Sequence, residues 1–175
     1  MKHSFSIRDM IYVSLMAVVI ALCSWLSVPS VVPFTMQTFA VFCALLLLGG
    51  KRGFFAVGLY ILLGVFGLPV FSGFRGGLGV LLGPTGGYIL GFLLAALLYW
   101  LGEKKLHSLL LLILGLLLCY LFGTLWFVYV YSADGKELGF GAALGLCVVP
   151  YLIPDAIKLL LAFVLARRVK KAVTL

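Results

Sequence analysis

The sequence has 175 residues, of which 65% are hydrophobic and only 10% are charged, and its formal net charge is +8. A soluble domain is about half apolar and about a quarter charged, so this composition excludes a soluble fold. The lysines and arginines lie between apolar runs rather than in one polar domain, which argues against nucleic-acid binding. We therefore predict an all-α membrane protein.

Apolar runs separated by charges or turn residues predict six transmembrane helices. They cover approximately residues 10–28, 34–50, 54–70, 86–102, 107–131 and 141–166. No polar linker or internal repeat divides the runs, so we expect a single integral membrane domain over residues 1–175. Four cysteines fall inside apolar runs without a CxxC pair, and we expect buried free thiols and no metal site or cofactor.

The first predicted helix, 10–28, carries a pair of small residues, Ala17 and Ala21, four positions apart. Such spacing permits close contact with another helix, inside the chain or in a partner. The third predicted helix, 54–70, contains Gly64 and Pro69 in its second half, so we expect it to be short or broken there.

Polar side chains open the second predicted helix, 34–50, where Thr35, Gln37 and Thr38 enter the membrane together. Thr35 is explained equally well as a helix cap, and a threonine can bond to its own backbone. Gln37 is harder to explain structurally, because an unsatisfied amide in hydrocarbon is costly. Gln37 and Thr35 are therefore candidate ligand contacts.

Residues 71–88 hold seven glycines, in a connection that precedes and opens the helix predicted at 86–102. This density predicts a loop without regular helix, in which the backbone can approach a ligand closely. Arg75 is its only cation, and Gly83, Thr85 and Tyr88 follow. An ordinary outer connection is the alternative, but long structureless loops in compact proteins are usually functional or disordered.

The last predicted helix, 141–166, contains two charged residues deep within it, Asp155 and Lys158. Asp155 precedes Arg167 by twelve residues, which at about 1.5 Å each places it roughly 18 Å into the membrane. Tyr151 shares their helix face, and Pro154 predicts a break there. Intramembrane charges are by default functional, although the pair could instead only neutralise itself and fix helix packing.

The distribution of cations predicts the orientation of the helices. Ten cations fall on one side of the membrane, namely Lys2, Arg8, Lys51, Arg52, Lys104, Lys105, Arg167, Arg168, Lys170 and Lys171. Only Arg75 and Lys136 fall on the other side. Since cationic flanks stay cytoplasmic, both termini are predicted to be cytoplasmic and the glycine-rich loop to face outward.

Four segments together resemble the BioY family, the biotin-specific substrate-binding (S) components of energy-coupling factor importers. They are residues 33–39 (PFTMQTF), 76–79 (GGLG), 83–88 (GPTGGY) and 154–158 (PDAIK). The resemblance implies six membrane helices with an outward-opening pocket, closed by the loop after the third helix. It also implies a bacterial cytoplasmic membrane protein with two kinds of partner, a transmembrane coupling protein and two cytoplasmic ATPases, with Ala17 and Ala21 as a docking face.

Chemistry and the resemblance together suggest how biotin is held. We expect Lys158 to pair with the biotin carboxylate, Asp155 to accept from the ureido N–H groups, and Tyr88 and Tyr151 to supply ring contacts and hydroxyls. The remaining candidate contacts are Thr35, Gln37, Arg75, Gly83 and Thr85. Arg75 competes with Lys158 for the carboxylate.

Four alternatives to a biotin-binding S component remain open at this point. Within transport, the chain could bind another vitamin or carry biotin without partners. Outside transport, it could be an intramembrane enzyme or a scaffold subunit. The absence of HExxH and Gly-x-Ser-x-Gly motifs argues against an enzyme, and the absence of GxxxxGK[ST] argues against ATP hydrolysis by this chain alone.

Overall fold

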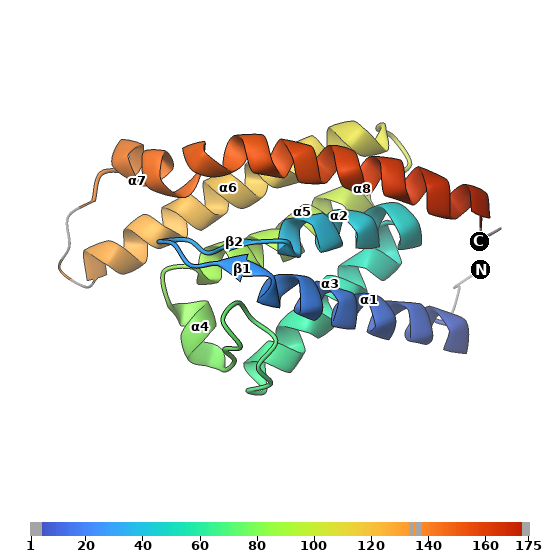
Figure 1. The fold of residues 1–175 in the computed structure, drawn as a ribbon, viewed down its shortest axis with the longest axis horizontal. Helices are drawn as coiled ribbons and strands as arrows, with labels where there is room; N and C mark the ends of the chain where they lie inside the picture. The colour runs from blue at the N-terminus through green and yellow to red at the C-terminus, as the bar shows by residue number, and fades with distance from the viewer. Residues whose placement is uncertain (1–4, 134, 136–137, 173–175) are drawn as a thin grey trace.

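The computed structural model describes residues 5–133, 135 and 138–172, and these are mostly helical (Figure 1). The helices are α1 (Ile7–Trp25), α2 (Gln37–Leu48), α3 (Gly50–Val65), α4 (Leu78–Leu82), α5 (Gly86–Gly102), α6 (Ser108–Ala133), α7 (Phe140–Cys147), the 3₁₀ helix η1 (Val149–Tyr151) and α8 (Leu152–Ala172). Between α1 and α2, strands β1 (Ser27–Val28) and β2 (Phe34–Thr35) pair antiparallel.

The lengths and hydropathies of the helices fit a membrane protein. Among the described residues, three stretches are long and apolar enough to cross a bilayer: Ile7–Trp25, Ser108–Ala133 and Phe140–Ala172. Gln37–Leu48 and Gly86–Gly102 are apolar but shorter. Large apolar side chains such as Leu15, Leu121 and Leu160, on α1, α6 and α8, are at least half exposed. Such exposure of apolar surface is costly in water and favourable in lipid.

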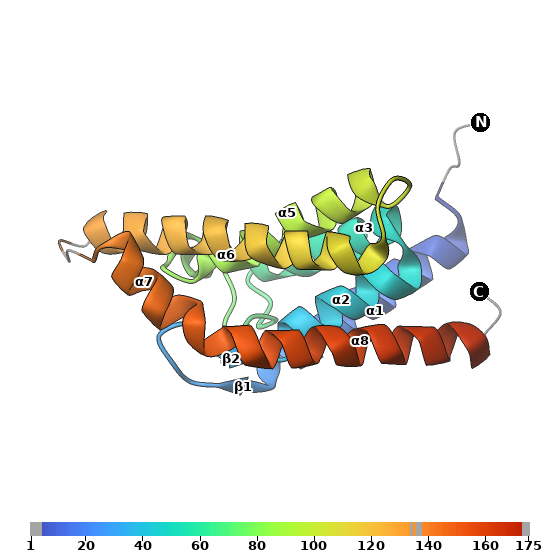
Figure 2. The ribbon, with the colours of Figure 1, turned by 90° about the horizontal axis from the view of Figure 1, so that it is seen from above.

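The elements divide between two ends of an elongated bundle. The start of α1, the α2–α3 turn, the α5–α6 turn and the end of α8 lie at one end in both views (Figures 1 and 2). The β1–β2 hairpin, α4 and α7 lie toward the opposite end. Lys2 and Lys136, which contribute to the predicted orientation, lie outside the described residues.

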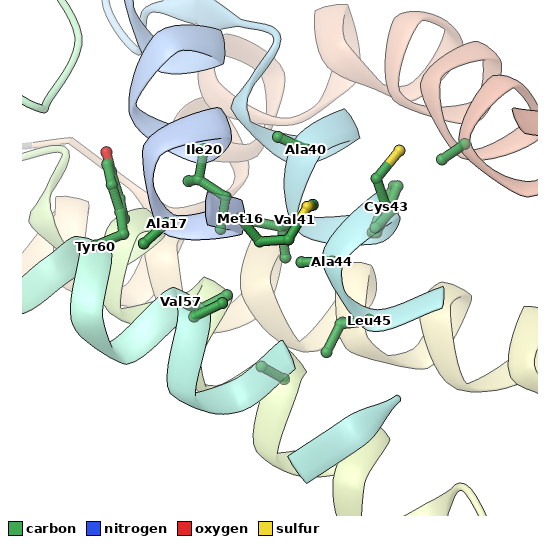
Figure 3. Packing of buried hydrophobic residues seen from close by; sticks show 14 of the residues in the cluster. Met16, Ala17, Ile20, Ala40, Val41, Cys43, Ala44, Leu45, Val57 and Tyr60 are labelled. Carbon is green, nitrogen blue, oxygen red and sulfur yellow. The ribbon is translucent and has the colours of Figure 1, made fainter. Parts of the chain in front are cut away.

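Small residues allow α1, α2 and α3 to pack closely in the core (Figure 3). Ala17 is 1% exposed and Ala21 is 7% exposed, and both belong to the buried cluster with Ala44 and Val57. The small-residue face of α1 therefore serves packing within this chain. The docking role that the resemblance implies for Ala17 and Ala21 stays a prediction.

The predicted helix over 141–166 is wrong as a single element. The chain leaves the helical conformation at Val148 (φ −124°, ψ −52°), and Pro150 lies in η1 before α8 begins. Pro154, where the sequence predicted the break, is the third residue of α8. In the first turn of a helix its missing N–H costs no hydrogen bond, so the break precedes it.

The glycine-rich connection is more ordered than predicted. α3 ends at Val65, as Gly64 and Pro69 suggested, but the loop contains the short helix α4 and a bridge between Phe71 and Arg75. Phe71 is buried against Tyr60 with ring centroids 5.6 Å apart. The connection is therefore folded back onto the bundle rather than free of regular structure.

Candidate ligand-binding site

One cavity opens between the hairpin, α5, α6 and α8, and it contains most of the predicted contacts. Its walls combine apolar side chains with a few polar and charged groups that converge on one hollow, as is typical of small-molecule sites. Eight of the nine candidate contacts line it: Thr35, Gln37, Arg75, Thr85, Tyr88, Tyr151, Asp155 and Lys158. The structure thus brings together predicted contacts from four separate segments of the chain.

The charged pair of α8 forms the polar floor of this cavity. Asp155 and Lys158 are each 4% exposed, and the Lys158 Nζ lies 2.8 Å from Asp155 Oδ1. Lys158 also donates to the backbone carbonyl of Thr35 at 2.7 Å. Asp155 lies in the first turn of α8, where the positive end of the helix dipole favours a carboxylate.

The pair faces the cavity and retains capacity for a ligand. Tyr120 of α6 donates to Asp155 Oδ2 at 2.6 Å, and the ring of Phe34 lies 3.9 Å from the Lys158 Nζ. A carboxylate has about four acceptor positions and an ammonium has three N–H groups. Two acceptors and one donor remain after these bonds, so both groups can still bond to a guest.

Two further hydrogen-bonded pairs fix polar groups around the cavity. The hydroxyls of Tyr88 and Thr124 lie 3.0 Å apart, joining α5 to α6. The Gln37 side chain donates to the Tyr60 hydroxyl at 3.1 Å, joining α2 to α3. Thr35 accepts from the Gln37 backbone N–H at 3.3 Å, so it supports the start of α2 and lines the cavity as well.

Tyr151, the last residue of η1, connects this side of the cavity to the hairpin. Its hydroxyl donates to the Val32 carbonyl and lies 2.9 Å from the Ser30 hydroxyl. Its ring stacks on Phe34 with centroids 6.2 Å apart. The hairpin that separates α1 from α2 is therefore held against the start of α8, which the sequence did not indicate.

Arg75 lines the cavity as an exposed cation without an acidic partner. Its Nε donates to the Ser72 carbonyl at 3.2 Å, and none of the described carboxylates lies within ion-pair distance. The segment that carries Arg75 is anchored to α1, because Ser24 donates to the Val70 carbonyl and Trp25 donates to the Pro69 carbonyl at 2.7 Å. The guanidinium is thus free to bind an anion.

Two residues differ from the predicted set. Gly83 does not line the cavity, and its carbonyl instead accepts from the Trp126 indole N–H at 3.0 Å. Tyr120, which holds Asp155, was missed because it lies in a leucine-rich helix. The sequence did contain a signal: Tyr120 and Thr124 carry hydroxyl groups in the apolar middle of that run and, being four residues apart, share a helix face.

Comparisons with known proteins agree on one family. The model of the BioY family matches residues 1–175. A probable biotin transporter of Pyrococcus horikoshii is 41% identical over 162 residues, covering 90% of this chain and 95% of the relative. A biotin transporter of Thermotoga maritima is 39% identical over 169 residues, covering 94% and 96%.

A solved structure has the same fold. The crystal structure of an S-component for biotin from an ECF-type ABC transporter matches with a TM-score of 0.84 at 26% identity. The match covers 98% of this chain and 95% of that chain. The structural match therefore extends over nearly the whole chain.

Proposed function

This chain belongs to the BioY family and is a transporter component for biotin rather than an enzyme, and we propose that it binds biotin in the cavity above Asp155 and Lys158. The observation that carries the proposal is the buried ion pair, which is hydrogen-bonded to Tyr120 and lines a cavity. A scaffold role would not require a hollow beside the charges.

The charges favour a revised orientation of the ligand. The Asp155–Lys158 pair is neutral overall and offers both an acceptor and a donor, which suits the N–H and C=O groups of the ureido ring. Arg75 has no acidic partner among the described residues and suits the carboxylate. We therefore propose Arg75, in place of Lys158, as the principal contact of the carboxylate.

We further propose six transmembrane helices, formed by α1, α2, α3, α5, α6 and α7–α8, with both termini in the cytoplasm. The proposal rests on the common end of the α2–α3 and α5–α6 turns and on the cations beside them. The chain lacks a nucleotide-binding motif, so uptake would draw energy from a coupling protein and two ATPases in the cytoplasmic membrane.

Ligand titration of the purified protein tests the binding proposal. Biotin should raise the melting temperature at low concentration, because a native-state ligand stabilises by mass action, and riboflavin, thiamine and pantothenate should not. Stabilisation by another vitamin alone would assign a different substrate. No stabilisation by any of the four would favour the scaffold role and contradict the proposal.

Reconstitution tests the partners. Liposomes holding this chain alone should bind biotin without accumulating it, whereas addition of a coupling protein and its two ATPases should give accumulation that requires ATP. Biotin accumulation by the chain alone would instead identify a solitary carrier.

A further inference from the structure

Two neighbouring hollows, separate from the biotin cavity, lie at the end of the bundle that holds the start of α1 and the α2–α3 turn. The larger one is an apolar groove of about 810 Å³, including open space. Its walls are Met10, Val13 and Ser14 of α1 and Gly58, Leu59 and Leu62 of α3. None of these residues lines the biotin cavity.

The smaller hollow is polar and shares one lining residue with the groove. It is lined by Asp9, Lys51, Arg52 and Glu103, and Phe5 borders both hollows. The Phe5 ring contacts Phe55 of the groove with centroids 5.0 Å apart. A single ligand that reached from one hollow to the other would therefore need an apolar part and a polar part.

The polar hollow holds two acids and two bases, and both acids already have partners. Glu103 is engaged, because its carboxylate accepts the Gly50 N–H at 2.6 Å at the start of α3. Arg52 lies 2.7 Å from Asp9, yet its side chain is 45% exposed and retains free N–H groups. Lys51 has no acidic partner among the described residues, and its ammonium lies over the Phe5 ring at 5.2 Å.

We propose that this composite groove binds an anionic phospholipid, with its phosphate on Lys51 and Arg52 and an acyl chain between α1 and α3. The groove lies on helices proposed to face lipid, and its polar end lies among the cations that orient the protein, where anionic headgroups gather. A free phosphate ion would leave the apolar half unfilled. This lipid site is separate from the biotin cavity, and the proposal does not depend on biotin binding.

Native mass spectrometry of the detergent-solubilised chain tests the site with phosphatidylglycerol and phosphatidylcholine as probes. Wild type should retain one phosphatidylglycerol and little phosphatidylcholine. Lys51→Gln with Arg52→Gln should weaken phosphatidylglycerol retention at least about tenfold, and Lys51→Gln alone should weaken it in part while leaving the Arg52–Asp9 pair intact. Arg167→Gln with Arg168→Gln, which removes the same charge from α8, should leave retention unchanged.

A steric pair tests the acyl half of the site. Ser14→Trp fills the groove from an exposed position, whereas Leu15→Trp adds an indole one residue away, outside it. Only Ser14→Trp should reduce phosphatidylglycerol retention. The shift in melting temperature with biotin should persist in every variant, which shows that each is folded.

Three results would overturn the proposal. Equal loss in the α8 control would show general attraction of lipid to a basic surface. Binding of glycerol phosphate as tight as that of the diacyl lipid would show a phosphate site without an acyl groove. A dimer of this chain that Ser14→Trp disrupts, with no lipid bound to wild type, would show that a second copy fills the groove.

Discussion

At the scale of single residues, the site depends on charges that the membrane would otherwise exclude. Lys158 and Asp155 tolerate burial because they bond to each other, to the Thr35 carbonyl and to Tyr120. Breaking such a pair leaves one buried charge without a partner, and this costs more than the pair contributes. Removal of either partner should therefore destabilise the empty site, and both groups keep hydrogen-bonding positions for a ligand.

Lys158→Ala should weaken biotin binding by about 2–5 kcal/mol, since the ligand would lose a buried charged donor, and it should also lower thermal stability, since Asp155 would be left buried and unpaired. That loss corresponds to at least about thirtyfold in Kd, measurable by titration calorimetry. The double variant Asp155→Asn with Lys158→Ala removes the unpaired charge and should recover thermal stability without recovering affinity. Affinity of the single variant equal to that of wild type would contradict a ligand role for Lys158.

Arg75→Gln should weaken biotin binding about tenfold, which is about 1.4 kcal/mol and appropriate for an exposed cation that meets a carboxylate. The same variant should bind biotin methyl ester as wild type does, because the ester has no charge for Arg75 to pair with. Lys158→Ala should weaken both ligands equally. Should Lys158→Ala alone discriminate between acid and ester, Lys158 holds the carboxylate.

At the scale of elements, hydropathy and turn residues predicted where helices lie better than where they break. The helix over 86–102 was predicted with its observed bounds because two glycines open it and Glu103 follows it. The kink at Val148 was missed because its residues are as apolar as the helices on either side. α4 was missed because it spans five residues between glycines, and the hairpin because each strand has two.

The same limit applies to the site. The charges of α8 and the polar start of α2 could be predicted, because each is expensive in a membrane wherever it lies. Their common cavity could not, since it depends on how α6 brings Tyr120 to Asp155 and how the hairpin brings Thr35 to Lys158. Those contacts join positions 35 and 123 residues apart in the chain.

The junction between α3 and the glycine-rich connection gives a prediction at this scale. A Cβ at Gly64 would lie 2.1 Å from the ring of Phe71, whereas a Cβ at Gly58 in the same helix meets nothing closer than 3.8 Å. Gly64→Ala should therefore displace the connection and destabilise the protein by about 1–3 kcal/mol. Gly58→Ala should be neutral or stabilise by up to about 1 kcal/mol.

Thermal unfolding in detergent, with and without biotin, measures both variants. Because the displaced segment carries Arg75, Gly64→Ala should also reduce the shift in melting temperature that biotin gives. An unfolding temperature of Gly64→Ala equal to that of Gly58→Ala would show that Phe71 does not hold the connection against α3.

At the scale of the whole molecule, the placement of cations and the placement of the cavity are linked. One pair of cations lies at the start of α3 and another in the α5–α6 turn. Both places are at the end of the bundle away from the hairpin and α4. The cavity is walled by the hairpin and the glycine-rich connection. If cationic connections stay in the cytoplasm, the mouth of the cavity must face outward, where a scarce vitamin is captured.

Single cysteines test this orientation in intact cells after the four native cysteines are replaced. Gly139 and Leu106 are both exposed and lie at opposite ends, before α7 and in the α5–α6 turn. A membrane-impermeant maleimide should label Gly139→Cys from outside, and Leu106→Cys only after the cells are permeabilised. Both variants should still bind biotin, which excludes misfolded protein as the source of labelling. Labelling of Leu106→Cys in intact cells would show the opposite orientation. The binding cavity would then face the cytoplasm, and biotin could not enter it from outside.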